Sequence, residues 1–262
     1  MSNLIYHYSN TDTIYKIIRS RSIWFSDITK TNDPTEYQVG FEIVSKIVID
    51  CFPKLYFILN EIHPDNINEK FKILSASFSR DGDCLSLWRM YGDDGEGAAI
   101  CFNMDNLKSY ALFARYIKQM SPVFGSILFF EIKYSNAEFQ KVIRDFLDSW
   151  SHQDNFVNQG MLKSALIRFC YTYKSRNYRD EREIRAVVEV DEAVTPYDVK
   201  TRDGTYGKTH YHELNTEFES ISSIKSVVLG PKCKMTPIEF ENEIRIHGLD
   251  KMDVSKSKVQ YR

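Results

Sequence analysis

The sequence predicts a single domain of the α+β class that covers residues 1–262. Segments with the two-residue repeat of strands alternate with helical segments at the start of the chain, a mostly helical stretch follows, and strand-like segments return after it. No internal repeat, low-complexity tract or linker rich in proline, glycine and serine divides the chain. The helical stretch at 135–180 is predicted to be an insertion into this one domain.

Apolar spacing and capping residues predict the N-terminal elements. Isoleucines at helical spacing follow the capping side chains of Asn10 and Thr11 and predict a helix. Asn32-Asp33-Pro34 combines a capping side chain with an early helical proline, so a second helix is predicted to follow it. The predicted elements of this half are strands at 4–8, 22–25, 73–78 and 98–102, and helices at 10–20, from 34 toward 51, and at 85–91.

The C-terminal half begins with the predicted insertion and ends in strands. Thr236-Pro237 opens a last helix, which Gly248 ends. The other predicted elements are a strand at 126–134, amphipathic helices at 137–150 and 161–173, strands at 183–190 and 224–229, a loop or hairpin at 191–209 with a returning strand at 211–214, and an edge strand at 257–261.

Composition and charge indicate an ordinary globular protein of the cytoplasm. Hydrophobic residues make up 43% and charged residues 27% of the chain, and the formal net charge of -2 gives no global attraction to nucleic acid or membrane. The count of five cysteines is odd and contains no CxxC pair, which favours buried free thiols in a reducing compartment. The N-terminus lacks a signal-peptide pattern, and no window is apolar enough to span a membrane.

The first candidate site residues lie on the first predicted strand. Alternation places Tyr6 and Tyr8 on one face of that strand and His7 and Ser9 on the other. A histidine two residues before a serine can hold a ribose hydroxyl or a phosphate. The alternative is a histidine packed at a strand end beside a capping serine, and spacing alone leaves both open.

Asn32, Asp33 and Glu36 surround the predicted start of the second helix. The free backbone N–H groups of a helical first turn can hold an anion. Capping explains the same residues without any ligand.

A third group of candidates combines serines, aromatics and an arginine. Ser77 and Ser79 share one face of their predicted strand, and Trp88, Arg89 and Tyr91 follow on the short helix. An aromatic side chain near an arginine suits stacking of a base and clamping of a phosphate. A core tryptophan with an ion-paired arginine is the structural alternative.

A late motif carries two carboxylates. Glu181, Glu183 and Arg185 are expected on one strand face, where neighbouring like charges need a cation or hydroxyl opposite them; Arg179, Arg182 and Arg185 are the candidate cations. A carboxylate at a strand end can hold a ribose hydroxyl and stabilise an oxocarbenium-like transition state. A surface ladder of ion pairs is the alternative.

Other common motifs are weak or absent. His210-x-His212-Glu213 is a weak metal pattern because no cysteine or aspartate accompanies it, so no metal is expected. The chain contains no GxxxxGK[ST], GxGxxG or GxSxG, which removes support for phosphate-loop ATPases, Rossmann dehydrogenases and esterases.

Seven short motifs follow one another along the chain: Tyr6-His7-Tyr8-Ser9, Ile23-Trp24-Phe25-Ser26, Asn32-Asp33-Pro34 with Glu36, Ser77-Phe78-Ser79, Leu85 to Gly92, Gly97 to Ile100, and Glu181-x-Glu183-x-Arg185. In this order they resemble an uncharacterised bacterial and phage family, domain of unknown function 2971, from about residue 4 to about residue 232.

A more distant resemblance links the chain to ADP-ribosyltransferases of the DNA-modifying toxin type. It implies a split, mostly antiparallel sheet that grips NAD. His7, with Ser9 assisting, would hold the adenosine ribose, and Glu183, or Glu181 in its place, would hold the nicotinamide ribose. Tyr91 or Trp88 would stack on the nicotinamide, whereas Asn32-Asp33-Pro34 has no counterpart in this comparison.

The resulting hypothesis is a cytoplasmic NAD-consuming enzyme, of the ADP-ribosyltransferase or NAD glycohydrolase type, that acts as a toxin or antiphage effector. NAD would be its substrate, Arg89 would contact the pyrophosphate, and the acceptor would be nucleic acid, protein or water. One alternative is a module that binds a nucleotide or nucleic-acid end without chemistry. Another is a metal-dependent nuclease that uses Asp33, Glu36, Glu181 and Glu183. The sequence does not determine the oligomeric state.

Overall fold

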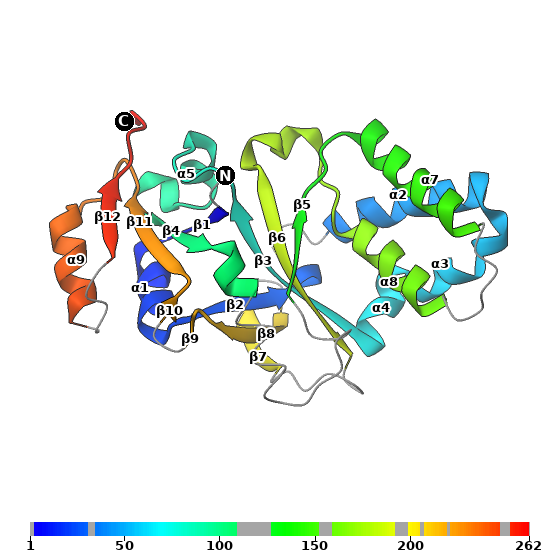
Figure 1. Cartoon of the computed structure of the whole chain (residues 1–262), viewed down its shortest axis with the longest axis horizontal. Coiled ribbons are helices and arrows are strands. Elements are labelled where there is room, and N and C mark those ends of the chain that lie inside the picture. The colour runs from blue at the N-terminus through cyan, green and yellow to red at the C-terminus, as the bar shows by residue number, and fades with distance from the viewer. Residues whose placement is uncertain are drawn as a thin grey trace.

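A computed structural model describes residues 3–30, 35–108, 127–151, 159–191, 199–204, 207–218, 221–246 and 252–261. Within these residues one large sheet organises the fold, and only the pair β11–β12 in it is parallel (Figure 1). The strands of this sheet are β1 (Leu4–Ser9), β2 (Ser22–Asp27), β3 (Phe71–Ser79), β4 (Ala98–Asn103), β5 (Leu128–Glu131), β6 (Glu183–Asp191), β7 (Lys200–Gly204), β8 (Gly207–Asn215), β11 (Ile224–Leu229) and β12 (Asp253–Lys256). The predicted α+β class with a mostly antiparallel sheet is confirmed.

The sheet forks at β3. One edge of β3 pairs with β6 along its whole length, from Phe71↔Asp191 to Ser79↔Glu183. The other edge pairs with two strands: β1 at Tyr6↔Ser79, and β2 at Ser26↔Ser75 and Asp27↔Leu74. No ladder partner pairs with Ser77 on that edge among the described residues, so the fork separates β1 from β2 there.

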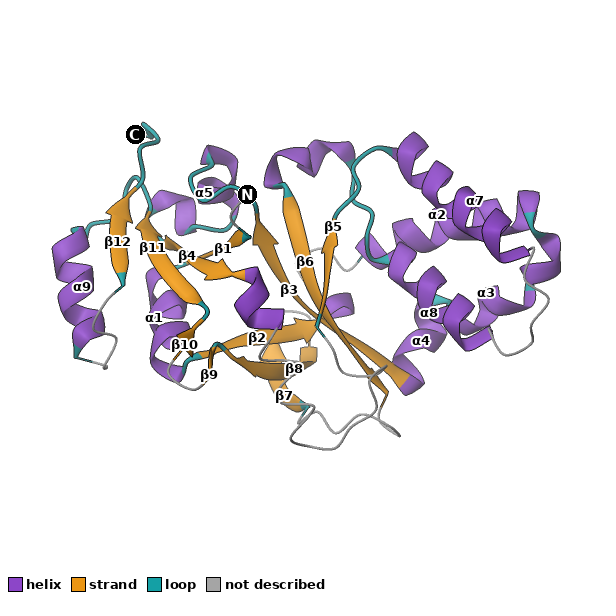
Figure 2. Ribbon diagram, in the orientation of Figure 1, coloured by secondary structure: helices purple, strands orange, loops and turns teal. Residues whose placement is uncertain are grey.

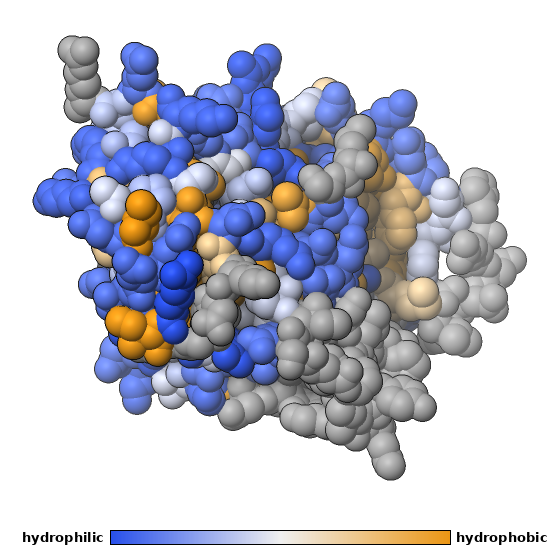
Figure 3. Space-filling view, turned by 60° about the vertical axis from the view of Figure 1, so that its left-hand side comes forward, coloured by the Kyte–Doolittle hydropathy of each residue, from blue (hydrophilic) through white to orange (hydrophobic). Residues whose placement is uncertain are grey.

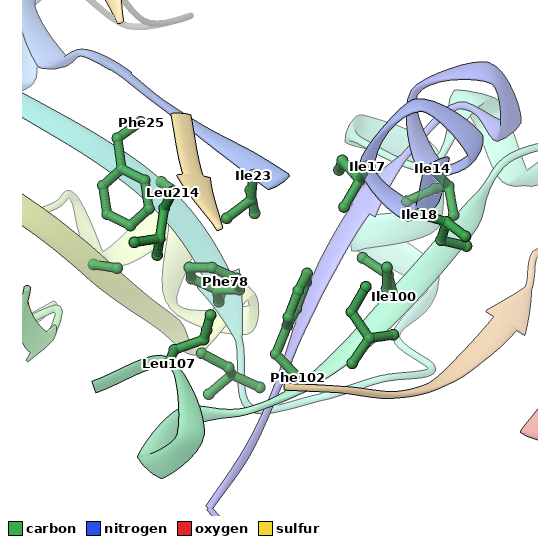
Figure 4. Close-up of a cluster of buried hydrophobic side chains, with 14 of the residues drawn as sticks. Ile14, Ile17, Ile18, Ile23, Phe25, Phe78, Ile100, Phe102, Leu107 and Leu214 are labelled. Carbon is green, nitrogen blue, oxygen red and sulfur yellow. The ribbon is translucent and has the colours of Figure 1, made fainter. Parts of the chain in front are cut away.

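One face of the sheet carries the larger apolar core. Alternation along β2 sends Ile23 and Phe25 to this face, where they meet Phe78 and Phe102 (Figure 4). Helix α1 (Thr11–Ser20) covers part of it through Ile14, Ile17 and Ile18, and α9 (Pro237–Arg245) through Phe240 and Ile244. The short strands β9 (Glu217–Phe218) and β10 (Ile221–Ser222) form a separate pair.

A second apolar core lies under a layer of helices at one end of the sheet (Figure 2). Its elements are α2 (Glu36–Cys51), α3 (Phe57–Glu61), α4 (Pro64–Lys70), α7 (Asn136–Ser151) and α8 (Gln159–Cys170). Helices α7 and α8 belong to the predicted insertion, and both pack against α2, which precedes it by a long stretch of sequence. The charged residues described below lie where this layer meets β3 and β6.

A third cluster forms around Trp88 on α5 (Leu85–Met90). Its indole N–H donates to Asp83 Oδ1 over 2.8 Å, and its ring meets Tyr8 at 4.7 Å between centroids. The same aspartate accepts the backbone N–H of Lys258 over 2.8 Å, so it ties the C-terminal segment to this cluster.

Most of the predicted elements are present with boundaries shifted by a few residues. Asn10 caps α1 by accepting the N–H of Thr13, and Thr236 with Glu239 forms a capping box on α9. The predicted edge strand at 257–261 is wrong: the last strand is β12, because it pairs in parallel with β11, whereas the residues after it are irregular. Residues 191–209 were predicted as a loop or hairpin, and β7 and β8 form the hairpin.

The surface shown in Figure 3, around α9 and β12, is mainly hydrophilic, with small separate hydrophobic areas. In the part of the chain that is described, no helix combines the length and apolar character that crossing a bilayer requires.

Close packing of α2 on α8 depends on Gly40. A β-carbon there would lie 2.0 Å from the backbone oxygen of Cys170, whereas a β-carbon at Gly160, near the start of α8, would meet no atom within 4 Å. We expect Gly40→Ala to lower the free energy of unfolding by about 2 kcal/mol, since the helices must move apart. Gly160→Ala should change it by less than about 0.5 kcal/mol or raise it slightly. Urea unfolding of both variants checks this, and equal effects would contradict the predicted close contact.

Candidate functional site

The Glu181-x-Glu183-x-Arg185 motif spans the end of a short 3-10 helix, η5 (Arg176–Glu181), and the start of β6. Arg182 between them adopts a left-handed backbone with φ of 43°. This turn lets Glu181 and Glu183 lie in the same charged cluster although they come from different elements. Alternation then places Arg185 on the Glu183 face of β6, toward the helical layer.

Lys174 lies among three carboxylates. Its ammonium is 2.7 Å from Glu181 Oε2, 3.0 Å from Glu36 Oε1 and 3.4 Å from Glu183 Oε2. The segment after α8 is held in place because the backbone N–H of Lys174 donates to the carbonyl of Lys133. None of the four side chains is more than 9% exposed, so the interaction takes place in a largely dry environment.

Arg185 is the second cation of this buried cluster. Its guanidinium donates to Glu183 Oε1 over 2.8 Å, to Glu36 Oε2 over 2.6 Å and to the backbone oxygen of Tyr171 over 2.9 Å. Its side chain is 3% exposed. Arg185 therefore holds the two glutamates in place, and its donors are used inside the protein.

The two motif glutamates have pKa shifts of opposite direction. Burial by itself raises the pKa of Glu183, but the charges of Arg185 and Lys174 outweigh burial and lower it. Burial also raises the pKa of Glu181, and there the bonds from Lys174 and Tyr91 only partly oppose it. For Lys174, burial lowers the pKa, and the charges of Glu183 and Glu36 more than compensate and raise it. Two carboxyl groups with separated pKa values are typical of acid–base sites.

Hydroxyl groups complete the cluster. The Tyr91 hydroxyl donates to Glu181 Oε1 over 2.9 Å, and the Tyr134 hydroxyl accepts the backbone N–H of Glu183 over 2.9 Å. Burial raises the pKa of Tyr134 to about 12, so this hydroxyl stays protonated. Ser79 is buried and donates to the backbone oxygen of Glu181 over 2.6 Å, which fixes the turn before β6.

Ser77 is the exposed contact of the buried cluster. It is solvent-exposed on β3, and its hydroxyl donates to Glu183 Oε1 over 2.8 Å. Because β1 and β2 diverge at the fork, no strand pairs with the outer backbone edge of Ser77 within the described residues. An exposed residue thus provides the hydroxyl that occupies one oxygen of an otherwise buried carboxylate.

His7 meets the same serine from another side. Its Nδ1 lies 2.9 Å from the backbone oxygen of Ser77. Because a carbonyl oxygen only accepts, Nδ1 carries the proton, and in the neutral ring Nε2 is left as an acceptor. Burial lowers the pKa of His7, which favours this neutral form, although the bond to Ser77 partly opposes the shift. The ring also packs edge-on against Phe78, 5.8 Å between centroids.

His7 and Glu183 were predicted to face one wide pocket. In the structure they are connected through Ser77 instead. Both residues contact Ser77, one through its carbonyl and the other through its hydroxyl. Phe78, which the imidazole contacts, points to the opposite face of β3 from Ser77. The two side chains thus approach one residue from two sides of the forked sheet.

Several predicted binding residues have structural roles instead. Stacking of a ligand on Trp88 is wrong for this structure, because the ring is fully buried. Tyr8 is 7% exposed, and its hydroxyl donates to the backbone oxygen of Asp81. Arg89 is exposed on α5, and Ser9 is half-buried at the end of β1, where it pairs with Ala98. Neither forms a described contact with the buried cluster.

The predicted cations were only partly correct. Arg185 pairs with the glutamates, but Arg179 and Arg182 have side chains that are 63% and 68% exposed. The surface ladder considered as an alternative is also wrong, since both glutamates are buried. Asn32 and Asp33, predicted to bind substrate, lie outside the described residues.

Two members of the cluster were not predicted. Lys174 follows an apolar helix and has no motif around it, and Tyr134 ends a predicted strand. The motifs contain three glutamates, Glu36, Glu181 and Glu183, but only one paired cation, Arg185. This excess of negative charge was the available signal for a second cation such as Lys174, because buried carboxylates require compensating cations.

Comparison with known families supports the resemblance to domain of unknown function 2971 over part of the chain. Residues 87–186 match the family model described as "Protein of unknown function (DUF2971)". This stretch contains Lys174, Glu181, Glu183 and Arg185 but leaves out Ser77, and it is shorter than the predicted range from 4 to 232. No curated protein and no solved structure matches the chain. The resemblance to ADP-ribosyltransferases stays a prediction.

Removal of the central ammonium should destabilise the fold. We expect Lys174→Met to lower the free energy of unfolding by about 3 to 5 kcal/mol, because it leaves three buried carboxylates with one cation. Lys163→Met removes an exposed partner of Glu61 and should cost less than about 1 kcal/mol. Urea unfolding at neutral pH measures both, and a Lys174→Met variant as stable as Lys163→Met would contradict the role of Lys174.

The two glutamates should respond to acid with opposite signs. The folded pKa of Glu183 lies below 4.5, so its stabilisation is present above pH 4.5 and lost as the pH falls through the lowered value. The folded pKa of Glu181 lies above 4.5, so its contribution is full below pH 4.5 and lost as the pH rises through the raised value.

On acidification, the stability advantage of the wild type over Glu183→Gln should therefore shrink, whereas its advantage over Glu181→Gln should grow. Denaturant unfolding of the three proteins across this pH range measures both differences. Two advantages that change in the same direction would contradict the assignment.

Proposed function

We propose that this protein binds NAD at the opening around Ser77 and cleaves the bond between nicotinamide and ribose, as an ADP-ribosyltransferase or NAD glycohydrolase. One observation carries the proposal: an exposed serine hydroxyl rests on the buried, ionised carboxylate of Glu183, and a neutral imidazole is bonded to the same serine. An external hydroxyl can take the place of this exposed one. A ribose offers such hydroxyls.

The chemistry that this arrangement supports is glycosidic cleavage. A ribose hydroxyl would replace the Ser77 hydroxyl at Glu183 Oε1. The bond between ribose C1′ and the ring nitrogen then breaks, its electron pair leaves with neutral nicotinamide, and the positive charge that develops on the ribose is stabilised by the Glu183 carboxylate. Lys174 and Arg185 favour the ionised form of that carboxylate.

Glu181 and His7 complete the proposed roles. The raised pKa of Glu181 makes its ionised form a stronger base than an ordinary carboxylate, so it would accept the proton of the attacking water or acceptor hydroxyl. Tyr91 orients it. Nε2 of His7 would accept a bond from a hydroxyl of the adenosine ribose.

A module that binds a nucleotide without turnover is the second candidate. The hydrogen bonds that both carboxylate oxygens of Glu183 already accept favour it. Oε1 of this residue already accepts Ser77 and Arg185, and Oε2 accepts Arg185 and Lys174. A carboxylate that is held this firmly can recognise a hydroxyl without taking part in bond cleavage.

The nuclease alternative has less support at this cluster. Glu36, Glu181 and Glu183 surround the Lys174 ammonium, which occupies the central position that a metal ion between them would need. Among the described residues, no group of three histidine, cysteine, aspartate or glutamate side chains is arranged to hold a metal. The fourth proposed ligand, Asp33, lies outside those residues.

Replacement of Glu183 by glutamine tests the proposed chemistry. We expect purified wild-type protein to bind NAD and to release nicotinamide, and Glu183→Gln to release it at least about 100-fold more slowly with NAD affinity retained, because the charge that stabilises the transition state is lost. Calorimetric titration with NAD measures affinity, and chromatographic detection of nicotinamide measures turnover.

Glu189→Gln is the matched control. Glu189 is a buried glutamate on the same face of β6, but it pairs with Arg168 and Tyr171, away from Ser77. This variant should keep both NAD binding and nicotinamide release. A wild-type protein that neither binds nor consumes NAD overturns the proposal, and equal losses in the two variants would indicate a structural effect. NAD binding without release, unaltered in rate by Glu183→Gln, favours the binding module.

A further inference from the structure

An exposed aromatic pair lies on β2 and β8, outside the charged cluster. Trp24 is 43% exposed, and its ring centroid lies 4.5 Å from that of Tyr211. The guanidinium carbon of Arg202 lies 5.2 Å from the Trp24 ring centroid, and the same side chain donates to the Ser26 hydroxyl over 3.2 Å. We call Trp24, Tyr211, Arg202 and Ser26 the sheet platform.

Strand alternation explains why these side chains face outward. Ile23 and Phe25 enter the larger core (Figure 4), so Trp24 and Ser26 point to the opposite face of β2. In the ladder with β8, Ser26 lies opposite Tyr211, which brings the second aromatic to that face. The face is thus set by the strands and does not depend on a flexible loop.

The sheet platform lies on the same face of the sheet as the side chain of Ser77, and the residue between them, Ser75, is buried. Ser26 pairs with Ser75, and Ser75 and Ser77 alternate onto the same face of β3. In the antiparallel register, Trp24 and Ser77 lie on the same side of the Ser26↔Ser75 pair. One strand spacing of about 5 Å and two steps of about 7 Å along the strands are therefore an upper limit on the distance between them. One extended ligand can therefore reach both places.

The charge on this face is suited to a polyanion. Lys200 pairs with Glu213 over 2.9 Å, and Arg202 adds a further positive charge beside the aromatic pair. Among the described residues on this face of β2, β7 and β8, two cations and one carboxylate leave one excess positive charge, on a chain whose net charge is -2. Among the platform contacts described, Arg202 forms no ion pair with a carboxylate, so its guanidinium can contact a phosphate.

We propose that the sheet platform binds a single-stranded nucleic acid, whose bases stack on Trp24 and Tyr211 and whose phosphate contacts Arg202. Aromatic side chains on an open sheet stack on unpaired bases, and a neighbouring arginine contacts the backbone. A duplex keeps its bases stacked inside and offers no free base face to the ring of Trp24. The inference goes beyond the proposed function, because it concerns a surface outside the charged cluster and requires no reaction there.

Binding of short dye-labelled oligonucleotides, measured by fluorescence anisotropy without NAD, tests the proposal. The wild type should bind single-stranded DNA or RNA more tightly than a duplex of the same sequence. Trp24→Ala should weaken this binding at least about fivefold, whereas Trp24→Phe, which keeps a stacking ring, should largely retain it. Arg202→Met should weaken binding and reduce its salt dependence.

Tyr56→Ala is the control, since Tyr56 is 63% exposed and lies outside the sheet platform. It should bind oligonucleotides as the wild type does. No binding by the wild type, equal binding of duplex and single strands, or a Trp24→Ala variant that matches Tyr56→Ala each overturns the inference.

Nicotinamide release to water, measured without oligonucleotide, separates this inference from the proposed function. Trp24→Ala should release nicotinamide at the wild-type rate. If oligonucleotides bind through Trp24 but no NAD is consumed, the proposed function fails and the binding surface stands. If NAD is consumed but no oligonucleotide binds, only the nucleic-acid inference fails.

Discussion

The contact of one ammonium with three carboxylates is the interaction on which this structure depends most. Lys174 connects Glu36 of α2 with Glu181 of η5 and Glu183 of β6, and α2 lies far from the other two elements in the sequence. Each buried carboxylate alone would be costly, and together they would repel one another. The Lys174 ammonium and the Arg185 guanidinium offset both the cost of burying the carboxylates and their mutual repulsion. As a consequence, the helical layer, the turn at Arg182 and the start of β6 are fixed relative to one another.

The fork of the sheet leaves the outer backbone edge of Ser77 without a ladder partner among the described residues. A sheet in which β1 or β2 ran along the whole edge of β3 would take the Ser77 carbonyl into its ladder. Instead, β1 pairs only near Ser79 and β2 only near Ser75, so Ser77 remains exposed between them. Its hydroxyl and its carbonyl then connect Glu183 with His7. Glu183 and the sheet platform both lie on the face of the sheet to which the Ser77 side chain points.

Much of the site could be predicted because several of its residues stand in local motifs. Glu181, Glu183 and Arg185 follow a strand-start pattern, and the periodicity of β3 places Ser77 and Ser79 on one face. The sequence left Trp88 open between a stacking aromatic and a core residue, because its helix is short and its neighbours give no reliable burial pattern. Contacts with Tyr8 and Asp83 bury it, as the structural alternative predicted. Lys174 was missed because a buried lysine has no local signature, and only the carboxylates that gather around it in space require it.

The sequence by itself determined most of the secondary structure and the faces of its strands, because alternation, helical spacing and capping act between residues that are close in the chain. It therefore set the outward direction of Trp24 and the shared face of Glu183 and Arg185. Tertiary structure alone decided which of these residues meet. Long-range pairing at β3 places His7 and Glu183 on either side of Ser77, and packing of α2 and α8 on the sheet brings Glu36 to Lys174. Such contacts arise from the joint burial of distant segments, which no local pattern encodes.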